Sequence, residues 1–500
     1  MTLDVHQLDE FVLIGSGVTL LAILAVRVSS RAGLPSLLLY LLMGVVLGEN
    51  VLGIEFDNAE LAHALGFAAL ALILAEGGLT TTWAAVRPSM RLGLSLATLG
   101  VTVSVAVVAV AAHFLLGMSW QLSVLLGAVT SPTDAAAVFS VLRGLPLSPR
   151  LVGALEAESG LNDAPTVVLV TLISSGSVAE HGVPATAGII VFELVAGVAC
   201  GLAVGFAGAW LMRRAALPSS GLYPLAVLCL TLLSYGAAAT AHASGFAAVY
   251  VAALVLGNSE LPHRSATRSF AEGVAWLAQI GLFVMLGLLL SPSRITWSVV
   301  GTAVAASLLL TFVARPVSVW ASSLVQRMPW REIGFVSWAG LRGAVPIVLA
   351  TIPLAKGATD SERLFDIVFV VVVISTVLTG PTLPAVARRL DVTRQLEPRS
   401  LDLEVAPLER VAADMLQVTI SPVSRLHGVE VGELRLPEGC SVSMVVRDGR
   451  AIVPERRTVL RRGDDLLVVA PRALVEPTVR RLRIVSAHGR LGRWLEAPET

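Results

Sequence analysis

Runs of apolar residues, separated by short polar segments, fill the first 390 positions of the chain. Because about 20 residues of α-helix cross the hydrocarbon core of a bilayer, each run predicts a transmembrane helix. The fold class predicted for this part is therefore an all-α polytopic membrane protein. We expect about thirteen spans, near residues 11–29, 34–52, 60–79, 92–116, 120–142, 150–175, 186–213, 221–241, 244–258, 270–290, 296–323, 333–354 and 364–388.

The basic residues of the connecting loops alternate along the chain. Loops that follow odd-numbered spans hold fourteen arginines, whereas loops that follow even-numbered spans hold only Arg294, Lys356 and Arg363. Short cytoplasmic loops are enriched in Lys and Arg. The alternation predicts a multi-pass protein with its N-terminus outside and its C-terminus in the cytoplasm.

Two of the predicted spans are interrupted. Residues 130–134 read Thr-Ser-Pro-Thr-Asp, and residues 340–346 read Gly-Leu-Arg-Gly-Ala-Val-Pro. If the seventh span links two six-helix halves, these are the fifth span of each half. Paired interruptions predict inverted six-helix repeats whose two broken helices cross at the transport site. Ordinary kinked helices of a bundle are the alternative.

The composition changes near residue 391. Residues 391–500 hold 16 acidic and 17 basic residues, against 20 and 19 in the much longer segment 1–390. Short β-type runs at 416–420, 441–447 and 465–470 and a helical stretch at 473–482 predict a small cytoplasmic α/β domain. The predicted parts are a transmembrane domain (1–390), a linker (391–407), a cytoplasmic domain (408–485) and a C-terminal tail (486–500).

The composition also excludes several classes of function. Only 14% of the residues are charged, against about 25% in typical soluble domains, and a net charge of zero gives no argument for nucleic-acid binding. Lys356, the only lysine, stands in Ala-Lys-Gly-Ala, so the chain lacks the Gly-Lys-Ser/Thr of a P-loop. Cys200, Cys229 and Cys440 are too far apart in the sequence for a metal cluster. We expect neither an enzyme nor a resident cofactor.

Ionisable residues at membrane depth cost about 2.5–3.5 kcal/mol each on insertion scales and are candidates for function. Glu193 and Arg315 lie nearer the ends of their predicted spans, so we expect them to snorkel or to support helix packing. The full set is Glu76, Asp134, Glu156, Glu158, Asp163, Glu193, Arg315 and Arg342.

The sixth span is the most informative. Residues 158–163 read Glu-Ser-Gly-Leu-Asn-Asp, so Glu158 and Asn162, and likewise Ser159 and Asp163, are i,i+4 neighbours on one helix face. Carboxylate, amide and hydroxyl oxygens suit a hard monovalent cation. The charge is too small for a Ca²⁺ cage, and zinc ligands are missing. A polar face that hydrogen-bonds between helices is the alternative.

The interrupted spans add further candidates. A broken helix leaves backbone carbonyls and N–H groups unpaired, so carbonyls near Thr133 can ligate a cation and Asp134 can balance free N–H groups. Glu76 lies in Ala-Glu-Gly-Gly-Leu of the third span. Arg342 is a buried cation that must find a carboxylate, and we predict Glu158 as its partner, which leaves Asp163 to titrate.

These motifs resemble the signatures of the monovalent cation/proton antiporter-1 family, the NhaP-like and NHE-like exchangers. The matching residues are Thr133-Asp134, 158–163 and 340–344, and the resemblance covers about residues 10–390. Residues 408–485, with Ile-Val-Pro at 452–454, resemble the C-terminal subdomain of RCK/TrkA potassium regulators. That domain is typical of the bacterial potassium/proton branch and favours K⁺ over Na⁺.

The resemblance implies a homodimer in the bacterial inner membrane, surrounded by lipid, whose mobile core moves like an elevator against a fixed dimerisation domain. Exchange would be electroneutral, because Asn precedes the aspartate. The cytoplasmic domain would bind a regulatory nucleotide or other small ligand, or provide a dimer contact. The implied roles are Asp163 as the ion- and proton-binding carboxylate, Thr133, Ser159 and Glu76 completing or flanking the site, Asn162 and Asp134 supporting it, and Glu158 with Arg342 holding the helices.

Competition at one carboxylate explains such exchange without further machinery. Burial favours the protonated form of a carboxylic acid and a bound cation favours the ionised form, so Asp163 holds one or the other. A Na⁺/H⁺ antiporter is the alternative within the same fold. Two other classes remain: a regulated cation channel, although no TVGYG-like filter is present, and a membrane ion sensor that signals through the tail.

Overall fold

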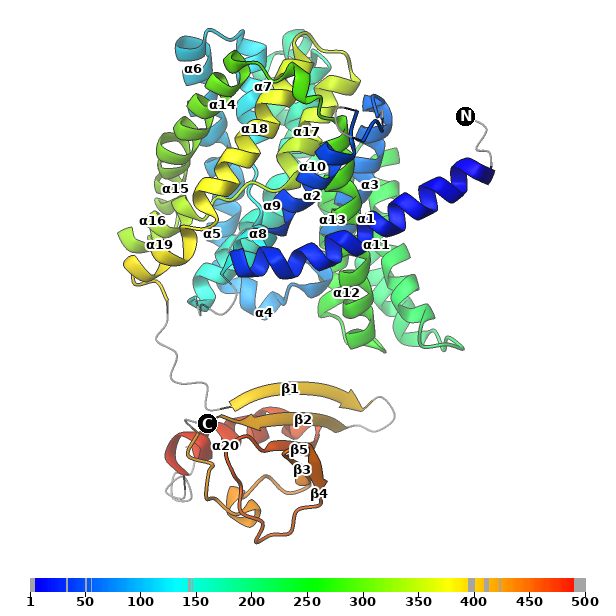
Figure 1. The fold of residues 1–500 in the computed structure, drawn as a ribbon, viewed down its shortest axis with the longest axis vertical. Helices are drawn as coiled ribbons and strands as arrows, with labels where there is room; N and C mark the ends of the chain where they lie inside the picture. Colours follow the sequence, from blue (N-terminus) through cyan, green and yellow to red (C-terminus); the bar gives the residue numbers. More distant parts are fainter. Residues whose placement is uncertain are drawn as a thin grey trace. The chain divides into compact units, whose positions relative to one another are not determined.

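The computed structural model describes residues 5–489 apart from 33–34, 50–51, 55, 143–144, 146, 394–400, 409–412 and 422–423. The chain divides into two compact units, Met1–Arg394 and Gln395–Thr500. The first is helical and the second contains a five-stranded sheet (Figure 1). Residues 490–500 of the predicted C-terminal tail lie outside the described residues.

The helical unit consists of helices joined by short connections, with π-helical turns η2 (Leu96–Gly100) and η4 (Leu310–Ala314) inside two long helical stretches. The long helix α10 is kinked at Gly182, whose φ is 77°. The helices are α1 (Val5–Ala32), α2 (Ser36–Leu47), α3 (Ala59–Thr80), α4 (Trp83–Val86), α5 (Met90–Ser95), α6 (Val101–Leu116), α7 (Trp120–Thr130), α8 (Ala135–Val141), α9 (Pro149–Ser174), α10 (Ser177–Arg214), α11 (Leu222–Thr240), α12 (Gly245–Asn258), α13 (Arg264–Leu289), α14 (Trp297–Leu309), α15 (Arg315–Ser323), α16 (Trp330–Trp338), α17 (Ala344–Ala355), α18 (Ser361–Thr379) and α19 (Leu383–Arg389).

Among the described residues, six helical stretches are long and apolar enough to cross a membrane, or seven if the bent pair α18 and α19 is one span. Shorter apolar helices, such as α2, α7, α12 and α17, add to these. The 26-residue helix α9 is not among the six, and it carries Glu156, Glu158 and Asp163. The helical membrane architecture is therefore clear, whereas the count of thirteen spans stays a prediction.

Several helices begin where the sequence offers a capping side chain. Asn58, Ser119, Ser148 and Ser244 each accept a hydrogen bond from a backbone N–H in the first turn of α3, α7, α9 and α12. Each such cap contributes about 1 kcal/mol to helix stability. Asp134 caps α8 in the same way, through the N–H of Ala137 at 3.1 Å, so this residue starts a half-helix at membrane depth.

The predicted interruption of two spans is confirmed. The chain leaves α7 at Thr130 and enters α8 at Ala135, and it leaves α16 at Trp338 and enters α17 at Ala344. The two breaks touch, because the N–H of Asp134 donates to the carbonyl of Leu341 at 2.9 Å. A side chain on Gly343 would collide with the Asp134 carboxylate, so the contact between the two breaks requires a glycine there.

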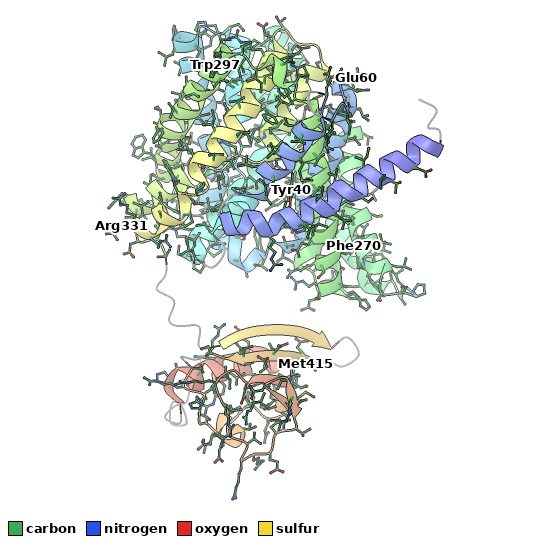
Figure 2. The ribbon with its side chains drawn as sticks, in the orientation of Figure 1. Tyr40, Glu60, Phe270, Trp297, Arg331 and Met415 are labelled. Carbon is green, nitrogen blue, oxygen red and sulfur yellow. The ribbon has the colours of Figure 1, made fainter. Side chains whose placement is uncertain are left out.

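Residues near the ends of different helices lie at opposite ends of the helical unit. Glu60 and Trp297 lie toward one end, and Phe270 and Arg331 lie toward the other (Figure 2). Trp297 is 90% exposed, and tryptophan is enriched where helices leave the bilayer. The ends that the loop charges assign to opposite sides of the membrane are therefore separated in space.

The second unit is an antiparallel sheet with strand order β1-β2-β5-β3-β4 and the helix α20 (Val475–His488). Alternate residues of β2, namely Leu416, Val418 and Ile420, are buried in its core. The prediction of 391–407 as a linker is wrong for its last residues, because β1 begins at Leu401 and pairs with β2 along its length. The strands are β1 (Leu401–Leu408), β2 (Ala413–Ile420), β3 (Ser441–Arg447), β4 (Arg450–Ile452) and β5 (Asp465–Pro471).

Candidate functional site

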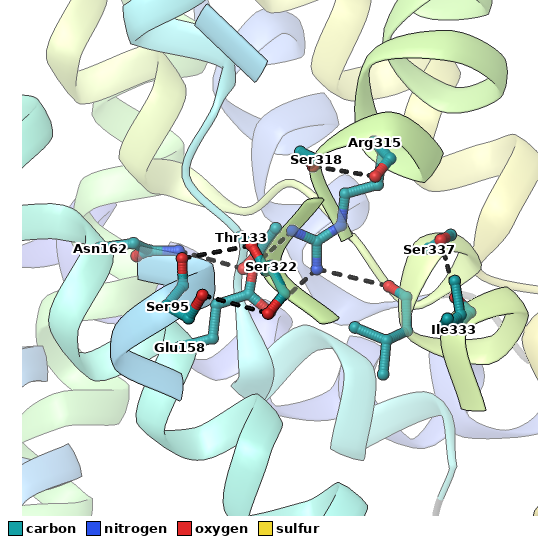
Figure 3. Close-up of polar contacts among 10 residues, drawn as sticks. Ser95, Thr133, Glu158, Asn162, Arg315, Ser318, Ser322, Ile333 and Ser337 are labelled. Atoms are coloured by element: carbon teal, nitrogen blue, oxygen red, sulfur yellow. Dashed lines mark hydrogen bonds and ion pairs between the residues drawn. The ribbon is translucent and has the colours of Figure 1, made fainter. Parts of the chain in front are cut away.

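The broken span α7–α8 and the continuous helix α9 bring three of the predicted site residues together. Asn162 donates from Nδ2 to Oγ1 of Thr133 at 3.1 Å (Figure 3). Asn162, Asp163 and Thr133 are exposed by 0%, 4% and 6%. Asp134, at the start of α8, interacts electrostatically with Asp163. A carboxylate, an amide and a hydroxyl therefore meet beside the crossing of the two broken helices.

Two oxygens of this cluster accept no hydrogen bond from the part of the chain that the structure describes. Oδ1 of Asn162 and Oδ1 of Asp163 are buried, and neither has a hydrogen-bond partner among the described residues. A buried acceptor without a donor costs about 1–3 kcal/mol. A bound cation, or a proton on Asp163, would remove this cost, so the arrangement suits a site that takes either one.

Pro165 removes the usual N–H donor of a backbone carbonyl in the same region. It lies inside α9 and has no N–H to donate to the carbonyl of Leu161, one turn earlier. Thr166 donates to the carbonyls of both Asn162 and Asp163, at 2.9 and 2.8 Å. Pro165 is not among the residues predicted from the sequence, although a proline two residues after an intramembrane aspartate is a visible signal of a perturbed helix.

Glu158 pairs with Arg315, so the predicted pair of Glu158 with Arg342 is wrong. The Nη1 and Nη2 atoms of Arg315 donate to the two oxygens of Glu158, with Nη2 to Oε2 at 2.9 Å (Figure 3). Arg315 also lies within 3.4 Å of the Val336 carbonyl. Of the two roles expected for Arg315, it takes the second, because it is only 5% exposed and joins α15 to Glu158 of α9 instead of snorkelling. It begins α15 directly after the π-helical turn η4, well inside the helical stretch 297–323.

Arg342 is buried beside this pair, at the second break. It is 2% exposed, and its Nε and Nη1 have no hydrogen-bond partner among the described residues. It interacts electrostatically with both Arg315 and Glu158. Arg315 and Arg342 line a small cavity of about 10 Å³ together with the hydroxyl-bearing residue Ser375, which is room for about one water molecule.

Glu76 and Ser159 complete the predicted set. Glu76 lines a larger cavity of about 400 Å³, together with Glu272 on α13 and Ala137 on α8. The structure thus puts Glu76 at a cavity that α8 also lines, and none of Thr133, Asn162 and Asp163 is among the residues that line it. Ser159 is half-buried on α9. No group of three His, Cys, Asp or Glu residues suited to a metal ion occurs in the described part of the chain.

Comparisons with known proteins show the family of the chain. The family profile of the transmembrane sodium/hydrogen exchangers matches residues 17–389, and the TrkA-C domain profile matches residues 415–482. The chain is 34% identical over 488 residues to the K(+)/H(+) antiporter NhaP2 of Shewanella oneidensis, an alignment that covers 95% of this chain and 83% of the relative. It is 35% identical over 465 residues to the K(+)/H(+) antiporter NhaP of Alkalimonas amylolytica, covering 91% of this chain and 80% of the relative.

The fold is also found in a solved structure. The sodium proton antiporter MjNhaP1 from Methanocaldococcus jannaschii superposes with a TM-score of 0.65 at 20% sequence identity, covering 75% of this chain and 99% of that chain. Together with the matched residues 17–389, this shows that the chain is a multi-pass membrane protein of the sodium/hydrogen exchanger family that also carries a TrkA-C domain.

Proposed function

We propose that this protein exchanges a monovalent cation, with K⁺ preferred, for protons across the membrane, and that Asp163 carries each in turn. The observation that carries this proposal is the pair of buried oxygens on Asn162 and Asp163, which have no hydrogen-bond partner among the described residues and lie beside the contact between the two broken helices. The preference for K⁺ rests on two relatives named K(+)/H(+) antiporter, which align along most of this chain. A response to Na⁺ alone is the alternative outcome.

Competition at Asp163 gives obligatory exchange. A bare carboxylate in a low-dielectric site is costly, so the loaded forms, protonated or cation-bound, are the ones that move. Glu158 and Arg315 form a buried pair whose charges cancel. Independently of this pair, a proton and a monovalent cation carry the same charge, so replacing one by the other at Asp163 leaves the charge of the moving site unchanged and makes the proposed exchange electroneutral.

The proposed movement is of one set of helices against another, and close glycine contacts support this division. A side chain on any of these glycines would come within 3.2 Å of backbone atoms of the partner helix. In one set, Gly44 and Gly287 join α2 to α13, Gly78 and Gly257 join α3 to α12, and Gly197 and Gly201 join α10 to α12; in the other, Gly93 joins α5 to α9, Gly127 joins α7 to α6, and Gly153 joins α9 to α4.

The proposed inverted repeat has support of the same kind. Each half contains one broken span, and each contains one π-helical turn in the long span before it, η2 and η4. The turn η2 contacts α15, and η4 contacts α6. We include in the proposal a homodimer, a cytoplasmic location of the C-terminal unit, and regulation of exchange by a small ligand of the TrkA-C domain.

The test is a proton-flux assay on purified protein in liposomes that contain a pH dye. K⁺, Na⁺, Rb⁺ and Li⁺ are added in turn to wild type, to Asp163→Asn, and to Glu193→Gln, which removes a half-buried carboxylate of α10 far from the cluster along the chain. We expect K⁺ to drive proton movement in wild type and Glu193→Gln, and the Asp163→Asn protein to fold and stay silent. K⁺-driven flux through Asp163→Asn would overturn the proposal, and electrical current without coupled proton movement would indicate a channel.

A further inference from the structure

The aromatic ring of Tyr250, on α12, lies directly against the ion motif of α9. A Cβ added to Gly160 would clash with Cζ and the hydroxyl oxygen of Tyr250 and would lie 2.6 Å from Cε2 of its ring. Tyr250 is only 6% exposed, so the ring fills the space between the two helices. Gly160 is therefore a glycine because the ring occupies the place of its side chain.

Gly160 is also close to the carboxylate that the proposed exchange uses. Gly160 and Asp163 are three residues apart in α9, so they lie on the same face about one turn from each other. Any displacement of α9 along α12 must move this face past the Tyr250 ring. The contact between Tyr250 and Gly160 therefore lies within about one helical turn of the carboxylate proposed to bind the cation and the proton.

Tyr250 itself is held firmly on its own set of helices. Its backbone carbonyl is 2.7 Å from where a Cβ of Gly78, on α3, would lie. The α12 helix is packed backbone to backbone on α10 through Gly201, whose Cβ would meet the Ala248 carbonyl at 2.5 Å. The backbone that carries the ring is therefore packed closely against α3 and α10, whereas α9 is contacted at Gly160 by side-chain atoms of Tyr250.

We propose that Tyr250 is a positioning residue for exchange. Its ring sets where α9 rests against α12, and Gly160 provides the clearance that lets the ion motif pass the ring. This inference rests on the proposed function, because it assigns the sliding contact of the proposed movement. It predicts that filling the clearance slows the movement and leaves cation binding at Asp163 intact.

The experiment measures K⁺-driven proton flux in liposomes for Gly160→Ala, with Gly236→Ala on α11 as the matched control, because a Cβ at Gly236 meets nothing within 4 Å. We expect Gly160→Ala to lower the maximal rate about tenfold, which is a barrier increase of about 1.4 kcal/mol, while the K⁺ concentration for half-maximal rate stays the same. A purely structural defect would instead lower the melting temperature or change both kinetic parameters.

A second substitution, at Tyr250, tests whether the ring causes the slow transport expected of Gly160→Ala. Gly160→Ala combined with Tyr250→Leu, which replaces the ring by a smaller side chain, is expected to recover most of the wild-type rate. Tyr250→Phe keeps the ring and should transport like wild type, whereas Tyr250→Trp, with Gly160 retained, should be slow. These two variants test the inference even if Gly160→Ala does not fold.

Two results would overturn the inference: a wild-type maximal rate in both Gly160→Ala and Tyr250→Trp, or a double variant as slow as Gly160→Ala. A slow Tyr250→Phe would transfer the role from the ring to the hydroxyl and overturn it as well. Failure of the proposed function looks different, because then wild type and Gly236→Ala would also show no cation-driven flux.

Discussion

Replacing Arg315 by leucine should be far more damaging to stability than replacing Arg342 by leucine. Arg315 holds both carboxylate oxygens of Glu158, and the two residues are 5% and 1% exposed. Removing one partner of a buried ion pair costs about 3–5 kcal/mol. Arg342 interacts electrostatically with Glu158 and offsets part of the loss, so we expect about 3 kcal/mol for Arg315→Leu.

The same reasoning predicts rescue by a second substitution. Replacing both partners of a buried pair by apolar residues is often neutral, so Glu158→Leu with Arg315→Leu should be within about 1 kcal/mol of wild type. Arg342→Leu should also cost little, since Nε and Nη1 of Arg342 have no hydrogen-bond partner among the described residues and removing unpaired polar groups is cheap.

These differences in stability can be measured by heating the purified proteins in detergent. The fraction of each protein that remains monodisperse in size-exclusion chromatography reports how much is still folded at each temperature. Wild type, the double variant and Arg342→Leu should have similar stability, and Arg315→Leu should be much less stable than these three. The reasoning is refuted if Arg342→Leu is as unstable as Arg315→Leu, or if the double variant is no more stable than Arg315→Leu alone.

Two further predictions concern the crossing and the C-terminal unit. Gly343→Ala puts a Cβ on the Asp134 carboxylate and should reduce exchange about tenfold or more, a barrier of at least about 1.4 kcal/mol, while Gly281→Ala, whose Cβ would meet nothing within 4 Å, transports normally in the same flux assay. Burial alone would raise the pKa of Asp464, but its hydrogen bonds to Arg447 and to a backbone N–H outweigh burial and hold this pKa below its usual range. The stability that this pair contributes is therefore fully present above the ordinary aspartate pKa of about 3.9 and is lost as the pH falls through the lowered pKa of Asp464. Arg447→Ala should remove this contribution at neutral pH and speed hydrogen exchange in β3 and β5. Equal exchange rates in the variant and wild type would contradict this.

The parts of the site that could be predicted are those with local signals. Proline and glycine inside apolar runs marked both broken spans, because these residues perturb a helix wherever it lies. The i,i+4 spacing within residues 158–163 marked a polar face of α9. Both signals depend on neighbours in the sequence, so they needed no knowledge of how the helices pack.

The partner of Glu158 could not be read in this way, because two arginines were available and the choice depends on packing. A signal was nevertheless present. Thr311, Arg315, Ser318 and Ser322 recur at helical spacing and are all at most 8% exposed, which describes a polar stripe turned inward. Strand β1 was missed for a related reason, since its pairing with β2 is a contact between chain segments and leaves little trace within either one.

The single carboxylate of Asp163 in the cluster with Thr133 and Asn162 has a consequence for energy conversion. Because Asp163 would take one proton or one monovalent cation in turn, a carrier that works as proposed moves no net charge, and the membrane voltage can neither drive nor oppose it. Transport then stops when the cation ratio across the membrane equals the proton ratio. A tenfold K⁺ gradient would balance a pH difference of one unit, about 1.4 kcal/mol. The protein would therefore convert one gradient into the other in a fixed ratio, because one carboxylate takes one cation or one proton.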